Sequence, residues 1–131
     1  MNARKFIALI ILAAAIMSGC GVSNAPKHLS TNEAVKFIAA EKNYLLVDVR
    51  TQEEYDKKHI PHAILVPIED LRAGKFDALP DKNRTLLVYC WTGRRAEDAA
   101  SILVKNGYTR VYEIGGLVDW TGATVGAEVQ N

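Results

Sequence analysis

The residues best suited to chemistry form one short stretch, Cys90-Trp91-Thr92-Gly93-Arg94-Arg95. An apolar run over 85–89 precedes it and a helical pattern over 96–106 follows it, which predicts a tight loop between a buried strand and a helix. The N-terminus of a helix carries unpaired N–H groups and partial positive charge, and two arginines add to that charge. Such surroundings favour the thiolate of Cys90, which is the nucleophilic form of a cysteine. The alternative is an inert cysteine of the core.

Strand and helix patterns alternate on both sides of this loop. Apolar runs predict strands over 28–29, 44–49, 63–66, 85–89 and 110–114. Helices are predicted over 30–43, 51–57, 68–73, 96–106 and 117–120, and capping boxes at Ser30 and Thr51 open the first two. This order predicts an α/β fold, with a mostly parallel central sheet of about five strands and helices on both faces. Ligands of such folds bind beyond the carboxyl ends of the strands, where the Cys90 loop is expected.

The composition is typical of one globular domain and gives no sign of a nucleic-acid partner. The chain has 131 residues, of which 49% are hydrophobic and 24% charged. Its formal charge is +1, and without Arg4 and Lys5 fourteen basic residues face fifteen acidic ones. A near-neutral surface of this kind does not suit a polyanion. We therefore expect no nucleic-acid partner, and separately we expect the protein to be a monomer.

The first twenty residues are predicted to be a targeting signal. Two basic residues, an apolar run over 6–17 and small residues follow one another in the order of a secretory signal. The end, Met17-Ser18-Gly19-Cys20, resembles the cleavage box of bacterial lipoproteins. The resemblance implies that residues 1–19 are removed and that Cys20 is lipidated, which would hold the protein outside the cytoplasm on a membrane of the bacterial cell envelope. The alternatives are an ordinary secretory signal with an incidental Cys20, or a retained membrane anchor.

The rest of the chain then divides into three parts, and the cysteines into two roles. We expect a lipidated N-terminus and linker over 20–27, the folded domain over 28–122 and a flexible tail over 123–131. With Cys20 lipidated, Cys90 is the single thiol of the domain, so neither an internal disulfide nor a cysteine-rich metal site is expected. The three histidines do not form a ligand pattern, and no metal or other cofactor is expected.

Four segments resemble, in the same order, the sequence motifs of rhodanese domains. They are Asp48-Val49-Arg50 with Glu54-Tyr55, His59-Ile60-Pro61 with Ala63-Ile64, Cys90-x-x-Gly93-x-Arg95, and Gly115-Gly116 with Trp120. The resemblance runs from about Leu29 to Trp120 and implies a rhodanese-like fold with sulfurtransferase activity. Two residues depart from the pattern near the second segment, because Lys58 and His62 stand where the family usually has glycine. If those positions require positive φ, histidine is tolerated there better than lysine.

The resemblance implies a role for each residue of the loop. The Cys90 thiolate would take a sulfane sulfur from thiosulfate or a persulfide and pass it to a thiol or cyanide. Backbone N–H groups would cradle the anion and the persulfide. Trp91 would form a wall of the pocket mouth or serve as a packing residue. Arg94 would attract anions or be only an exposed arginine, and Arg95 would pair with the leaving anion or brace the loop. The cradle comprises Trp91, Thr92, Gly93, Arg94 and Arg95.

Asp48 and Arg50 end a neighbouring strand and are expected to support the loop as an ion pair, although Arg50 could instead contact substrate. A cysteine-based phosphatase is a rival interpretation. It is disfavoured because the loop from Cys90 to Arg95 is one residue shorter than in that class, and Tyr89 stands where those enzymes have histidine. A second alternative is a carrier of persulfide sulfur, or a protein-interaction module, that does not turn over substrate.

Overall fold

The fold is built on one parallel sheet, which is seen in a computed structural model that describes residues 25–127. Its strands are β1 (Lys27–His28), β2 (Tyr44–Asp48), β3 (Ile64–Leu65), β4 (Thr85–Cys90) and β5 (Val111–Gly116). They lie in the order β1-β5-β4-β2-β3, and every neighbouring pair is parallel. The predicted α/β fold with a parallel sheet is confirmed.

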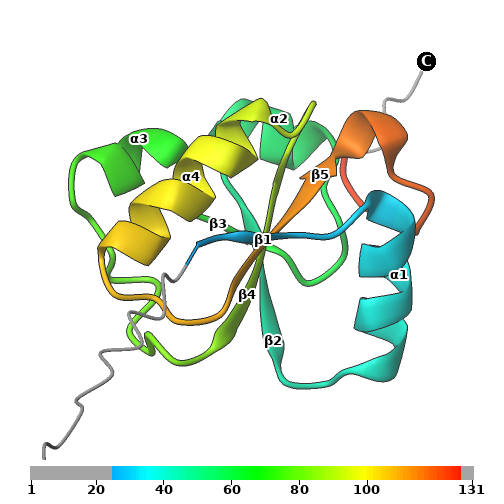
Figure 1. The fold of residues 1–131 in the computed structure, drawn as a ribbon. Coiled ribbons are helices and arrows are strands. Elements are labelled where there is room, and N and C mark those ends of the chain that lie inside the picture. Colours follow the sequence, from blue (N-terminus) through cyan, green and yellow to red (C-terminus); the bar gives the residue numbers. More distant parts are fainter. Residues whose placement is uncertain (1–24, 128–131) are drawn as a thin grey trace, which may run out of the picture.

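Helices cover both faces of the sheet, as predicted. They are α1 (Thr31–Ala40), α2 (Gln52–Lys57), α3 (Ile68–Arg72) and α4 (Arg94–Lys105), with a 3-10 turn over Leu117–Asp119. Helix α1 lies on one side of the sheet, and α3 and α4 lie on the other (Figure 1). Both predicted capping boxes form, with Ser30 and Thr51 as N-caps.

The central strand β4 is buried because both of its faces are covered. Leu86 and Val88 belong to the core beneath α3 and α4, whereas Leu87 and Tyr89 belong to the core beneath α1. This alternation follows from the two-residue period of a strand. A strand with two covered faces reads as a continuous apolar run, which is why the sequence pattern locates it. The strand therefore delivers Cys90 at a fixed position at its carboxyl end.

The pair Gly115-Gly116 lies at the end of β5. Gly116 is the last residue of β5 and pairs with Cys90 of β4. At the two departures from the family pattern, His62 has φ of +67°, whereas Lys58 has φ of −168° and is extended. Histidine therefore stands at the position that needs left-handed backbone, and lysine costs no backbone strain at position 58.

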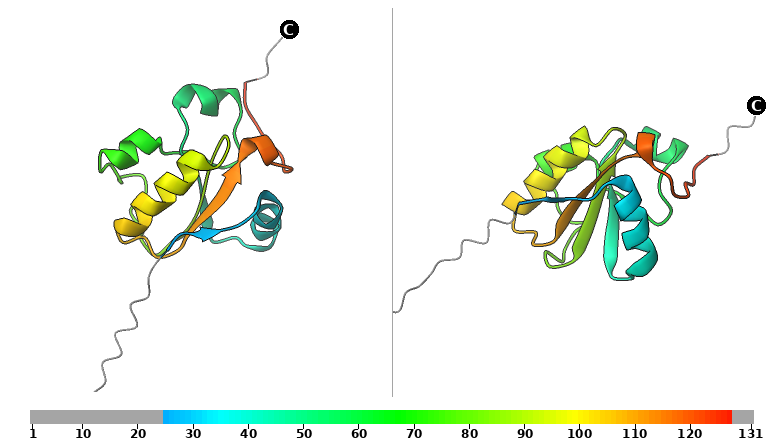
Figure 2. Two further views of the ribbon diagram at one scale, coloured as in Figure 1. Left: turned by 45° about the horizontal axis from the view of Figure 1, so that its top comes forward. Right: turned by 45° about the vertical axis from the view of Figure 1, so that its right-hand side comes forward.

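The C-terminal segment runs beside α2 and is paired with it (Figure 2). His59, which follows α2, and Val125 form an antiparallel bridge, in which the two backbone N···O distances are 2.7 and 2.8 Å. In addition, the N–H of Ala127 donates to the carbonyl of Asp56 in α2. Val125 and Ala127, which make these backbone contacts, lie in the stretch 123–131 that the sequence predicts to be a flexible tail. The predicted signal, Cys20 and residues 128–131 lie outside the described residues. Between residues 25 and 127, none of the helices has the length and apolarity needed to cross a membrane.

Candidate active site

Cys90 lies where the central strand ends and the loop into α4 begins. It is 1% exposed, and its Sγ accepts a hydrogen bond from the backbone N–H of Gly93 at 3.0 Å. Gly93 has φ of +102°, a conformation that residues with a side chain resist. Helix α4 starts at the next residue, so the sulfur lies beside the positive end of a twelve-residue helix. The sequence predicts that several backbone N–H groups surround the sulfur, and the N–H of Gly93 forms a hydrogen bond with it.

The end of β5 presses directly against the Cys90 loop. A Cβ added to Gly116 would lie 2.1 Å from the carbonyl oxygen of Trp91, and one added to Gly93 would lie 3.3 Å from the Cα of Gly115. The same Trp91 carbonyl accepts a hydrogen bond of 3.0 Å from the N–H of Val118. Because Gly115 and Gly116 have no side chains, β5 can pack directly against the loop and support it.

Arg95 braces the loop against α2. Its Nη1 and Nη2 each donate to a carboxylate oxygen of Glu54 at 2.8 Å, in the bidentate geometry that guanidinium favours. Glu54 also accepts hydrogen bonds from the N–H and hydroxyl of Thr51. These contacts, that of Arg95 foremost, lower the pKa of Glu54 to about 2. Of the two roles expected for Arg95, the geometry matches the brace, while Arg94 lies exposed at the start of α4.

Asp48 and Arg50 form a buried ion pair below the loop. Asp48 is 0% and Arg50 2% exposed, and the guanidinium donates to Oδ2 at 2.8 Å and to Oδ1 at 3.0 Å. Arg50 also donates to the carbonyl of Lys58 and lies over the ring of Tyr89. Burial, together with the Asp48 carboxylate, raises the pKa of Tyr89, whose hydroxyl accepts from the N–H of Ile60. The pair thus joins the end of β2 to the segment after α2.

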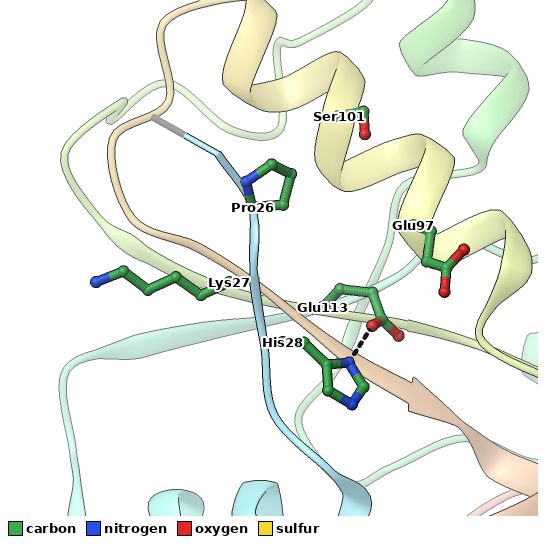
Figure 3. A pocket seen from close by; sticks show the side chains of 6 residues that line it. All are labelled: Pro26, Lys27, His28, Glu97, Ser101 and Glu113. Carbon is green, nitrogen blue, oxygen red and sulfur yellow. Dashed lines mark hydrogen bonds and ion pairs between the residues drawn. The ribbon is translucent and has the colours of Figure 1, made fainter. Parts of the chain in front are cut away.

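A second buried carboxylate, which the sequence interpretation missed, supports the loop from β5. Glu113 is 5% exposed, accepts from the N–H of Gly115, and lies 2.6 Å from Nδ1 of His28 (Figure 3). These two residues border a pocket of about 260 Å³ between β1 and α4, where Glu97 and Ser101 face them. A carboxylate inside the apolar pattern of 110–114 was the available signal. The sequence interpretation also did not count Glu54 as a site residue, and the signal that could have pointed to it was its place in the capping box with Thr51.

Open pockets flank the Cys90 loop. One, of about 510 Å³, is lined by Arg50, Glu54, Lys57, Lys58 and Trp91, and is called the mouth pocket below. Trp91 is 43% exposed, which fits its expected place in a wall of the mouth. Thr92 lines a different pocket, shared with Gly93 and Glu113.

The histidines of the described part have local roles. The ring of His59 stacks on Tyr55 with 3.8 Å between ring centroids, and its Nδ1 lies 2.7 Å from the Tyr55 carbonyl. Over residues 25–127, no three His, Cys, Asp or Glu side chains gather closely enough to hold a metal ion.

The model of the rhodanese-like domain matches residues 30–123, and the chain belongs to that family. The predicted family is therefore confirmed.

Several relatives carry names that describe sulfur chemistry. The chain is 42% identical over 73 residues to thiosulfate sulfurtransferase PspE of Escherichia coli, a match that covers 56% of this chain and 70% of the relative. It is 33% identical over 94 residues to thiosulfate sulfurtransferase GlpE of Coxiella burnetii, covering 71% and 82%. It is also 33% identical to the putative sulfur carrier protein YrkF of Bacillus subtilis, of which 46% is covered.

Solved structures of rhodanese-like proteins are also similar to this chain. A rhodanese with anions from E. coli is similar with a TM-score of 0.59 and 38% identity, over 64% of this chain and 99% of that one. The rhodanese-like domain of the Alr3790 protein from Anabaena gives a TM-score of 0.70 at 28% identity, over 78% and 80%.

Substitution of Gly116 by alanine is expected to disrupt the loop. Its Cβ would meet the Trp91 carbonyl at 2.1 Å, so backbone would have to move, and the free energy of unfolding in urea should fall by about 3 kcal/mol or more. Gly74→Ala is the control, because no atom lies within 4 Å of the added Cβ and only the strain of positive φ, about 1 kcal/mol, remains. Equal losses in the two variants would contradict the close packing of β5 on the loop.

The Arg95–Glu54 pair predicts a specific loss of stability in acid. Because the pKa of Glu54 falls from 4.5 to about 2 in the folded protein, its contribution is complete above pH 4.5 and is lost as the pH falls towards 2. Glu54→Gln should therefore reduce the pH dependence of the free energy of unfolding in that range. Glu41→Gln, an exposed residue after α1, should keep the dependence of the wild type. An unchanged profile in Glu54→Gln would show that the pair contributes nothing to stability.

Proposed function

We propose that the protein is a monomeric sulfurtransferase that carries sulfane sulfur as a persulfide on Cys90. The thiolate attacks the outer sulfur of thiosulfate, a new S–S bond forms, and the S–S bond of thiosulfate breaks so that sulfite leaves with the electron pair. Cyanide or an acceptor thiolate then attacks the terminal sulfur. The product is thiocyanate or a new persulfide, and the Cys90 thiolate is regenerated.

The observation that carries this proposal is the hydrogen bond from the Gly93 N–H to the sulfur of Cys90 at 3.0 Å. A donor already aimed at the sulfur stabilises negative charge there without reorganisation during the reaction. The start of α4 adds partial positive charge, and Arg95, held by Glu54, positions that first turn beside Cys90. The Gly93 N–H and the start of α4 both stabilise negative charge on the Cys90 sulfur, and equally on the persulfide that replaces it.

The names of the relatives support the same chemistry. PspE and GlpE are both named as thiosulfate sulfurtransferases. YrkF is named as a putative sulfur carrier, and this favours a second candidate, in which Cys90 accepts sulfur and delivers it to a protein without rapid turnover of thiosulfate. The two candidates differ in how many molecules of thiosulfate each Cys90 consumes: an enzyme consumes many in succession, whereas a carrier is loaded once and waits for its protein acceptor. Thiocyanate formed in large molar excess over protein would favour the enzyme.

The central prediction concerns the state of Cys90 after treatment with thiosulfate. Mass spectrometry of the purified protein should find one added sulfur atom on Cys90, and incubation with cyanide should remove it as thiocyanate. Cys90→Ser should gain no sulfur and keep the circular dichroism of the wild type, because serine preserves the small side chain. Cys20→Ala is the matched control and should load as the wild type does. Absence of added sulfur on wild-type Cys90 would refute the proposed reaction.

We also propose that the protein lies outside the cytoplasm and is held to the cell-envelope membrane by lipid on Cys20. The support is the order of basic, apolar and small residues before Cys20. Expressed in bacteria, Cys20→Ala should move from the membrane fraction to the soluble fraction, whereas Cys90→Ser should stay with the membrane. Retention of Cys20→Ala in the membrane fraction would contradict the lipid anchor.

A further inference from the structure

The charges around the mouth pocket are almost all neutralised by ion pairs, and Lys58 is the exception. Four charged residues line the pocket with Trp91. Arg50 is paired with Asp48, Glu54 with Arg95, and Lys57 with Glu53 at 2.8 Å. Among residues 25–127, Lys58 forms no ion pair, and its side chain is exposed. Of the described residues that line this pocket, Lys58 is therefore the one whose charge is not paired; Arg94, which also forms no ion pair among residues 25–127, does not line it.

The position of Lys58 is held by the buried ion pair below the loop. Its carbonyl accepts a hydrogen bond from Nη2 of Arg50, and its N–H donates to the carbonyl of Glu54 at 3.2 Å. Its φ of −168° is extended backbone that any residue can adopt, so no strain is associated with a side chain there. The backbone at position 58 is thus fixed, while the ammonium group is free to meet a ligand in the pocket.

We propose that Lys58 docks the anionic sulfur donor in the mouth pocket and favours donors with two negative charges. This inference rests on the proposed function, since it assigns a binding role at the entrance to the same site. A dianion such as thiosulfate gains more from an unpaired cation than a monoanionic thiosulfonate does. Cys90 is 1% exposed, so the donor meets the exposed mouth, with Trp91 at 43%, before its sulfur reaches the thiolate. Lys58 is a positioning residue that acts before the chemical step.

The direct test measures binding without sulfur transfer. Calorimetry of the Cys90→Ser protein with thiosulfate at low ionic strength gives the affinity, and Lys58→Met in that background should weaken it by about threefold to tenfold. Lys58→Arg should keep the affinity because it keeps the charge. Lys36→Met, which removes an exposed lysine on α1, is the matched control and should also leave the affinity unchanged.

Kinetics with Cys90 intact provide the second measurement. Lys58→Met should raise the KM for thiosulfate by the same factor while kcat stays nearly constant, and the effect should shrink with added salt. The KM for a monoanionic thiosulfonate should rise less than that for thiosulfate.

The outcomes separate docking from the proposed reaction. Equal thiosulfate affinities for the Lys58→Met and Lys36→Met proteins, or no binding of thiosulfate to Cys90→Ser, would overturn the docking role. Equal effects on both classes of donor would overturn the preference for dianions. Failure of the wild type to gain sulfur on Cys90 would instead contradict the reaction, because the calorimetric affinity does not depend on transfer.

Discussion

The position of α2 is the constraint on which the site depends, and polar contacts hold this helix in place. None of its six residues is buried, so it contributes little to the apolar core. Glu54 binds Arg95 at the start of α4, and the hydroxyl of Tyr55 donates to the carbonyl of Ala63 at 2.6 Å. Beyond its end, the Lys58 carbonyl receives the guanidinium of Arg50. Loss of these contacts would release one wall of the mouth pocket.

The two ion pairs differ in their physical consequences. Asp48 and Arg50 are almost completely buried, so removal of either partner would leave an unpaired charge in the interior and cost several kcal/mol, about 3–5. Arg95 and Glu54 are about one third exposed, so solvent screens their attraction and their main effect is geometric. The buried pair therefore shapes the carboxyl end of the sheet, and the partly exposed pair orients the first turn of α4 around Cys90.

A buried sulfur beside a helix start suits transfer of a single atom. The short loop places the Gly93 N–H on the sulfur of Cys90, while β5 closes the space behind Trp91 through Gly116. Lys58 lines the mouth pocket together with Trp91, on the side from which we propose that the donor enters.

The sequence by itself determined the features that depend on neighbouring residues. Both capping boxes, the buried strand before Cys90 and the glycine of its loop follow from local patterns, because a capping box spans four residues and a strand has a two-residue period. The tertiary structure alone decided which distant groups meet. Glu54 and Arg95 lie 41 positions apart, Gly116 meets Trp91 across a strand pair, and His59 pairs with Val125 in a segment expected to be free. Such contacts depend on sheet order and helix packing, which bring remote residues together and leave no periodic signal in the chain.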